Sequence, residues 1–178
     1  FKTQVGRVSP TGKVPALVDG ELAIWDTLAI AEYLAEKFPE KHLWPTEAKA
    51  RAIARSVCAE MHSGFTALRS NCGMNIEAQL ADIGALVWRD KPSVRADVQR
   101  LVEMWSALLD KHGGPMLFGE FSIADAYYAP VCSRITTYAL PVPAHIKAYV
   151  ERVMALPGVQ AWVKDALAEQ DLVPFDEP

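Results

Sequence analysis

The sequence has 178 residues, of which 51% are hydrophobic and 22% are charged, and its formal net charge is −4. A chain of this composition and length buries roughly 70% of the surface that its unfolded form exposes, which predicts a globular fold. The acidic balance, with no cluster of Lys and Arg, argues against nucleic acid as a partner. No apolar run approaches the roughly 20 residues that cross a bilayer, and no leader opens the chain, so we expect a cytoplasmic protein with no membrane partner.

The first predicted elements are two short antiparallel strands. Residues 16–18 and 22–25 are apolar and flank the dipeptide Asp19-Gly20. Asp-Gly between two apolar runs is typical of a tight turn, so these residues are predicted to form a β-hairpin.

One helix follows the hairpin, and the character of the chain then changes. Apolar residues recur every three or four positions over 28–38, which predicts a helix that Pro39 ends. Two strands and one helix leave one sheet face uncovered, so residues 1–39 are interpreted as the remnant of a larger α/β domain. The proline-containing residues 40–46 are predicted to form a linker, and residues 47–178 an all-helical domain.

Helical periodicity and its breakers divide the second domain. Glycine pairs and prolines mark the ends of most of these helices. The region 71–92 gives no clear pattern. The predicted helices run from about Glu47 towards Ser70, from near Ser93 to Gly113, and over 123–138, 144–155 and 158–168.

The three cysteines, Cys58, Cys72 and Cys132, are an odd number at wide spacings. Each lies in the part of the chain that is predicted to be all-helical. This usage is typical of reduced, structural thiols and not of a disulfide framework.

The stretch SPTGKVPALVDG places Pro15 at the start of an apolar strand, where it cannot donate a hydrogen bond to a neighbouring strand. A cis bond between Val14 and Pro15 would turn the chain and leave the backbone N–H and C=O of Val14 facing outward. Such an edge can bind an extended peptide as an added strand. A trans proline at the beginning of a strand is the structural alternative.

Asp26 and Thr27 stand where the hairpin meets the first helix. Either side chain can cap the helix, which stabilises it by about 1 kcal/mol. The same helix start offers free N–H groups to a carboxylate, and Asp26 offers a partner for an ammonium group. The pair therefore fits either a simple cap or the head group of an amino acid.

A capping box is predicted further along the chain. Ser122 and Asp125 have the Ser-x-x-Asp spacing, and Phe121 precedes them. Each side chain of such a box satisfies a backbone N–H of the other end, so a helix is predicted to begin here.

Three stretches, SPTGKVPALVDG, AIWDTLAIAEYLAEKFPE and GEFSIADAYYAP, occur in this order. Together they resemble the cytosolic glutathione S-transferase family, and bacterial members in particular, over about residues 9–163. The resemblance implies a thioredoxin-like α/β N-terminal domain, here incomplete, followed by an all-α helical bundle. The family's first strand, first helix and second strand would precede Phe1. The Ser, Tyr or Cys that activates glutathione lies in that segment, so the catalytic residue is unknown.

The resemblance also implies a glutathione site. The backbone of Val14, next to Pro15, would pair with the cysteinyl unit, and Lys13 would lie near the glycyl carboxylate. Asp26 and Thr27 correspond to the acid and hydroxyl that hold the γ-glutamyl group. Glutathione is then the co-substrate, and no metal is expected.

The electrophile site is predicted on the helix that ends near Ser70. Met61, Phe65 and Arg69 recur at every fourth position and would form one face of that helix. The structural alternative is that this stripe belongs to the core. His62 has no partners at metal-ligand spacing, and it is interpreted as a surface or core-lining residue.

The resemblance implies a homodimeric transferase that adds the glutathione thiolate to small hydrophobic electrophiles, as in detoxification. One alternative keeps glutathione but changes the reaction to thiol-disulfide exchange or dehalogenation. Another is a non-catalytic binding module with the same fold, since fold alone does not define function.

Overall fold

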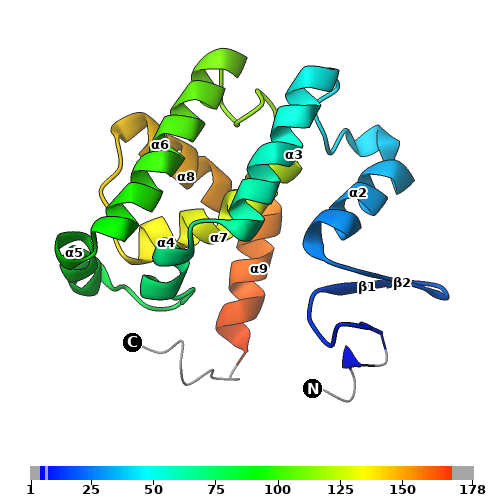
Figure 1. The fold of residues 1–178 in the computed structure, drawn as a ribbon, viewed down its shortest axis with the longest axis horizontal. Helices are drawn as coiled ribbons and strands as arrows, with labels where there is room; N and C mark the ends of the chain where they lie inside the picture. Colours follow the sequence, from blue (N-terminus) through cyan, green and yellow to red (C-terminus); the bar gives the residue numbers. More distant parts are fainter. Residues whose placement is uncertain (1–4, 7, 170–178) are drawn as a thin grey trace.

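The two short strands form a hairpin at one end of the molecule (Figure 1). The structure is a computed structural model that describes residues 5, 6 and 8–169. Strand β1 (Ala16–Asp19) pairs antiparallel with β2 (Leu22–Trp25). Asp19 lies opposite Leu22, so the tight turn is made by Gly20 and Glu21, one residue later than the sequence predicts. Gly20 has φ +62°, a conformation that glycine adopts without steric cost at the first central position of such a turn.

Helix α2 (Thr27–Lys37) and the short 3₁₀ helix η1 (Pro39–Lys41) follow the hairpin. Their positions confirm the predicted helix and its end at proline. The last helical residue, Lys37, also contacts Asp19 of β1, and Tyr33 donates a hydrogen bond to the same carboxylate. These contacts fasten α2 to the hairpin.

The rest of the described chain is helical. Several predicted helices are confirmed within two residues at their ends, and the unassigned region contains one further helix, α5. The helices are α3 (Ala48–Ser63), α4 (Thr66–Asn71), α5 (Ala81–Asp90), α6 (Pro92–His112), α7 (Ile123–Thr137), α8 (Ala144–Met154) and α9 (Pro157–Ala168). No helix of this described part is long and apolar enough to cross a membrane.

The single helix predicted from Glu47 towards Ser70 is wrong. Helix α3 ends at Ser63, and α4 begins at Thr66 after a turn in which Phe65 has φ 53°. This turn buries the ring of Phe65, which is 6% exposed and lies edge-on to Tyr128 with the ring centres 6.5 Å apart. Burial of a large aromatic side chain thus accompanies the change of direction.

The core of the helical part is built around three aromatic side chains from α6, α7 and α8. Trp105 packs edge-on against Tyr128 at 5.2 Å and against Tyr149 at 5.1 Å between ring centres, and all three are buried. Such edge-to-face pairs are the preferred geometry for aromatic rings.

The predicted capping box at the start of α7 is confirmed. The fully buried Asp125 accepts hydrogen bonds from the Ser122 N–H at 2.8 Å, the Leu117 N–H at 3.1 Å and the Tyr149 hydroxyl at 3.1 Å. Burial raises the pKa of this carboxyl group, while its hydrogen bonds act in the opposite direction. The box therefore ties three segments together as well as starting a helix.

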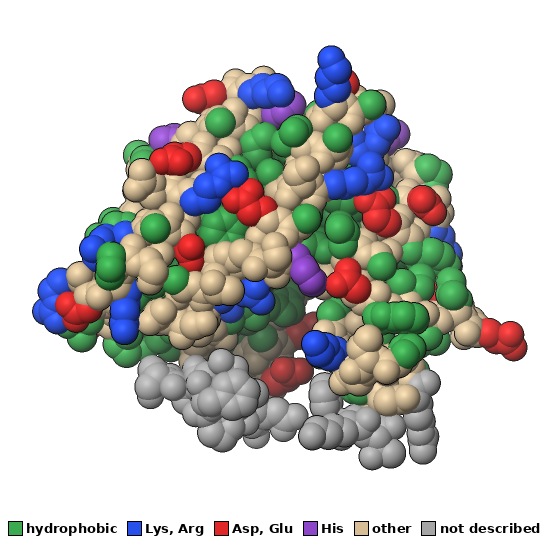
Figure 2. Space-filling model, in the orientation of Figure 1, with side chains coloured by type: hydrophobic (Ala, Val, Ile, Leu, Met, Phe, Trp, Pro, Cys, Tyr) green, Lys and Arg blue, Asp and Glu red, His purple; other side chains and the backbone are tan. Residues whose placement is uncertain are grey.

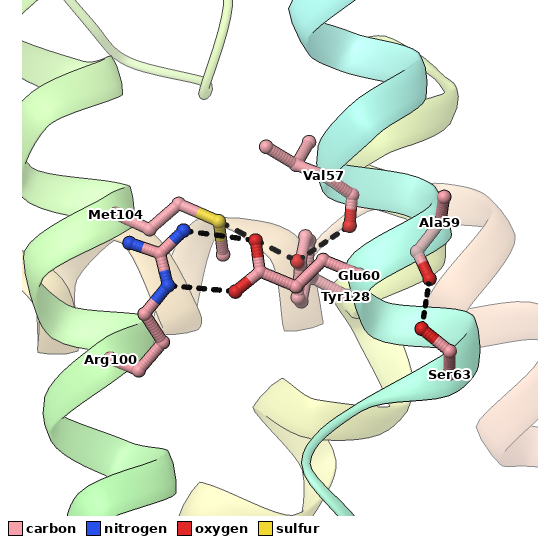
Figure 3. A network of polar contacts seen from close by, with 7 residues as sticks. All are labelled: Val57, Ala59, Glu60, Ser63, Arg100, Met104 and Tyr128. Carbon is pink, nitrogen blue, oxygen red and sulfur yellow. Dashed lines mark hydrogen bonds and ion pairs between the residues drawn. The ribbon is translucent and has the colours of Figure 1, made fainter.

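A polar network holds α3 against its neighbours (Figure 3). Arg100 of α6 donates two hydrogen bonds to the carboxylate of Glu60, at 2.7 and 2.9 Å. The Tyr128 hydroxyl of α7 donates to the Val57 carbonyl oxygen at 2.8 Å. Helix α3 is thereby fixed on two sides, and its last turn carries residues that face the cavities described below.

The hairpin and α2 lie beside the helical part and contact it directly (Figure 1). Arg55 of α3 donates to both carboxylate oxygens of Glu32 on α2, at 2.5 and 2.9 Å. The Ile123 N–H donates to the Leu43 carbonyl oxygen at 2.9 Å. The start of α7 and the segment after α2 are therefore joined through the backbone.

Candidate functional site

A cavity of about 400 Å³ lies between the loop before β1, the start of α2 and the end of α3. All of the residues that the sequence analysis assigned to glutathione line it, together with three others. The lining residues are Thr11, Lys13, Val14, Pro15, Trp25, Asp26, Thr27 and His62.

The loop before β1 presents an open edge to this cavity. The Val14–Pro15 peptide bond is cis, and Val14 is 60% exposed. The preceding loop is shaped by Thr11, whose hydroxyl lies 3.1 Å from that of Ser9 and accepts from the Lys13 N–H at 3.4 Å. The conformation that the sequence analysis considered for this stretch is thus present.

Asp26 uses its two carboxylate oxygens differently. It precedes α2 with φ 75°, and Oδ1 accepts from the N–H groups of Leu28 at 2.9 Å and Ala29 at 3.4 Å. Oδ2 lies 3.6 Å from Nε2 of His62. One oxygen caps the helix, which confirms the cap, while the other faces His62 in the cavity, and binding of an amino-acid head group stays a prediction.

His62 is a site residue that sequence reasoning missed. It comes from the last turn of α3 and reaches the start of α2, 36 positions away in sequence. Figure 2 shows histidine, acidic and basic side chains along the boundary between the helical part and the hairpin. A single histidine on a predicted helix carries no signal of such a contact, because the contact depends on how α3 packs against α2.

A second cavity of about 660 Å³ lies between α2, the ends of α3 and α4, and α7. Thr27 and His62 line both cavities, which are therefore neighbours. Most of the other lining side chains are apolar, and none is acidic. The lining residues are Thr27, Ile30, Ala31, Leu34, Leu43, Met61, His62, Arg69, Ile123, Ala126, Tyr127 and Pro130.

Two of the three predicted electrophile-site residues line this second cavity. Met61 comes from α3 and Arg69 from α4. Phe65, predicted between them on one helix face, is instead buried in the core against Tyr128. The helix break after Ser63 removes the continuous stripe on which that prediction depended.

The cysteines do not provide a nucleophile. All three are free and buried. Burial raises the pKa of Cys58 to about 12 and that of Cys72 to about 11, and it raises the pKa of Cys132 further. Because only the thiolate reacts readily, these thiols are unreactive near neutral pH. The described residues also contain no group of three or more His, Cys, Asp or Glu side chains that could hold a metal ion.

Tyr127 lines the second cavity, and its hydroxyl is buried. Burial is the main cause that raises its pKa well above the usual value, and nearby negative charges add to it. A tyrosine in this state is a hydrogen-bond donor and not a source of phenolate.

The hairpin has an exposed edge at a cis proline, and a helical bundle that contains the capping-box helix follows it. This is the arrangement of a thioredoxin-like domain followed by an all-α domain. The family model for the "Glutathione S-transferase, C-terminal domain" matches residues 52–165, and the model for the N-terminal domain matches residues 2–42. The chain belongs to the glutathione S-transferase family.

Individual relatives agree with this assignment. Glutathione S-transferase 1 of Dianthus caryophyllus is 31% identical over 137 residues, which are 75% of this chain and 60% of the relative. GstA of Escherichia coli O157:H7 is 31% identical over 180 residues, covering 93% of this chain and 77% of the relative. The chain spans 60% and 56% of the first two curated relatives.

A solved structure confirms the predicted fold class. A Burkholderia glutathione transferase homolog with bound glutathione superposes with a TM-score of 0.71 at 29% identity, covering 95% of this chain and 81% of that chain. The domain boundaries at residues 39–40 and 46–47 stay predictions.

Proposed function

We propose that this protein is a glutathione transferase that adds the thiolate of glutathione to small hydrophobic electrophiles, as in detoxification. One observation carries the proposal: a single cavity contains the exposed edge at Val14, the Asp26 oxygen that does not cap α2, and the cation of Lys13. The Burkholderia homolog that contains glutathione supports the same assignment.

The charges in the cavity complement those of glutathione. The tripeptide carries one ammonium group and two carboxylates around a central thiol. Asp26 provides the partner for the ammonium group, while the Thr27 hydroxyl and the positive end of the α2 dipole favour the neighbouring carboxylate. Lys13 provides a cation for the glycyl carboxylate, and the backbone of Val14 next to Pro15 can pair with the cysteinyl unit.

The chemistry requires that the thiol be ionised. A thiol with a pKa of about 8.5 is mostly protonated at neutral pH, and lowering this pKa by two units takes about 2.7 kcal/mol of preferential stabilisation of the thiolate. A hydrogen bond to a charged group contributes about 1.5–3 kcal/mol, so one hydroxyl donor and the N-terminus of a helix are sufficient to lower the thiol pKa by this amount. The sulfur then forms a bond to an electrophilic carbon, and a leaving group departs with its electron pair.

The neighbouring cavity is proposed to hold the electrophile. It adjoins the glutathione cavity through Thr27 and His62, so a thiolate and an acceptor bound in the two cavities would be adjacent. Met61 adds a flexible apolar surface that adapts to different shapes. Arg69 adds a positive charge.

We also infer a cytoplasmic homodimer. Apolar side chains are exposed on the hairpin, at Val18 and Leu22, and on α3, at Ile53. The free cysteines fit a reducing compartment. Light scattering of the full-length protein after gel filtration tests the dimer, and a monomer at micromolar concentration would contradict it.

The full-length protein tests the proposed function directly. We expect glutathione to bind in calorimetry and a chlorinated nitroaromatic to be conjugated faster than in solution. Absence of glutathione binding would overturn the proposal. Binding without conjugation, but with disulfide reduction or dehalogenation, would favour the alternative reactions. Binding without any of these reactions would favour a non-catalytic module.

The dehalogenation alternative has limited support from sequence similarity. A dichloromethane dehalogenase of Methylorubrum extorquens is 50% identical to this chain, but only over 38 residues.

A further inference from the structure

We propose that the electrophile of the second cavity carries a carboxylate, which Arg69 binds while the apolar part lies against Met61 and α7. This inference rests on the proposed function and names its substrate class. The cavity is lined mainly by apolar side chains and by no carboxylate, and Arg69 brings a permanent positive charge to it.

Arg69 has free hydrogen-bonding capacity. Its one recorded hydrogen bond runs from Nη1 to the His62 carbonyl oxygen, at 3.2 Å. A guanidinium group has five N–H donors in a planar fork that matches a carboxylate. By contrast, Arg55 and Arg100 each bind both oxygens of a glutamate. Among the described residues, no acidic side chain forms an ion pair with Arg69.

The acids on the neighbouring helices have other contacts, and Asp97 of α6 accepts a hydrogen bond from the Leu68 N–H, next to Arg69 in the sequence, at 2.9 Å. Glu32 on α2 pairs with Arg55, and Glu60 on α3 pairs with Arg100. Asp26 caps α2 and faces His62 in the neighbouring cavity. Arg69 is exposed and none of these acids pairs with it, so its guanidinium group is accessible to a ligand as well as to water.

The helix break positions this arginine. Because the chain turns at Phe65, α4 runs in a new direction, and Arg69 in its last turn reaches back to the final turn of α3. The hydrogen bond to the His62 carbonyl oxygen holds one end of the guanidinium group at the end of α3, and Arg69 lines the second cavity and not the first. A carboxylate bound there would lie beside, and not within, the glutathione cavity.

A matched pair of acceptors tests the inference. A chlorodinitrobenzoate and the corresponding chlorodinitrobenzamide share the ring, the leaving group and nearly the same shape. In both, the glutathione sulfur bonds to the carbon that bears chlorine, chloride leaves with the electron pair of the C–Cl bond, and the thiol proton goes to solvent. Each kcat/KM is divided by the uncatalysed rate constant, which removes the intrinsic difference in reactivity.

We expect the full-length protein to favour the benzoate by about tenfold in this normalised kcat/KM, as a charge-assisted contact predicts. Arg69→Met should abolish the preference, and Arg69→Lys should retain part of it. Arg89→Met is the matched control, because Arg89 is exposed on α5 and pairs only with its neighbour Asp90 among the recorded contacts. The preference should also fall as salt is raised.

Binding gives a second readout that does not need turnover. With glutathione present, calorimetry of dinitrobenzoate and dinitrobenzamide, which lack the leaving group, should show the same preference and its loss in Arg69→Met. The inference is overturned if wild type and Arg69→Met prefer the benzoate equally, or if wild type shows no preference. In either case, conjugation of both acceptors leaves the proposed function intact. If neither these two acceptors nor the uncharged chlorinated nitroaromatic is conjugated, the proposed function is overturned, and the binding preference alone then decides the inference about Arg69.

Discussion

At the scale of single residues, Asp26 caps α2 with one carboxylate oxygen, and we propose that it binds glutathione with the other. Asparagine keeps a side-chain oxygen for the helix cap and tolerates a positive φ, but it loses the negative charge. We therefore expect Asp26→Asn to weaken glutathione binding by about tenfold or more, with little change in thermal stability. Asp26→Ala should also lose about 1 kcal/mol of stability with the cap. Calorimetry and thermal melts separate the two effects.

Glu47 supplies a matched control for this substitution. It caps α3 by accepting from the Lys49 N–H at 2.8 Å and the Ala50 N–H at 2.6 Å, and it does not line the glutathione cavity. Glu47→Gln should leave glutathione affinity unchanged. Unchanged affinity in Asp26→Asn as well would remove Asp26 from the binding site.

At the scale of elements, Gly84 allows α5 to approach the end of α7. A Cβ atom at this position would lie 1.8 Å from the Tyr138 carbonyl oxygen. Alanine favours a helix over glycine by about 1 kcal/mol, but overpacking costs roughly 1–3 kcal/mol and forces the backbone apart. We expect Gly84→Ala to lower the free energy of unfolding in urea titrations.

Gly158, the second residue of α9, gives the opposite expectation. Nothing lies within 4 Å of a Cβ atom built there. Gly158→Ala should therefore stabilise the protein by about 0.5–1 kcal/mol. A Gly84→Ala protein as stable as Gly158→Ala would show that α5 can move without cost.

Some elements of the fold could be predicted from the sequence, and others could not. The hairpin, α2, α6 and the capping box at Ser122 and Asp125 depend on local patterns of turn residues, periodicity and caps, and the structure confirms them. The turn at Phe65 depends on burial against Tyr128, a residue of another helix. Periodicity alone therefore joined α3 to α4 and placed Phe65 in a ligand site.

The candidate site divides in the same way. Lys13, Val14 and Asp26 belong to short local motifs, and their position around one cavity was expected from the family resemblance. His62 enters the site only because α3 packs beside α2. Contacts between elements distant in sequence leave no mark in a single sequence, so this residue could not have been assigned.

At the scale of the whole molecule, the ion pair between Glu32 of α2 and Arg55 of α3 joins the hairpin and α2 to the helical part. The hydrogen bonds from Arg55 are the main cause that lowers the pKa of Glu32 below its ordinary value of 4.5, and burial opposes them. A carboxyl group with a lowered pKa in the folded state stabilises the fold at pH values above its ordinary pKa. That contribution is lost as the pH falls through the lowered value.

Glu32→Gln should therefore destabilise the protein at pH 7 and much less at pH 3. Because both side chains are partly exposed, solvent screens the pair, and the expected loss at pH 7 is about 0.2–1 kcal/mol. Urea unfolding of wild type and variant at the two pH values measures the change. Asp90→Asn is the control, since its partner Arg89 is the adjacent residue of the same helix and joins no separate parts. If the difference in the free energy of unfolding between wild type and Glu32→Gln were equal at pH 7 and pH 3, the charge of Glu32 would not contribute to holding the two parts together.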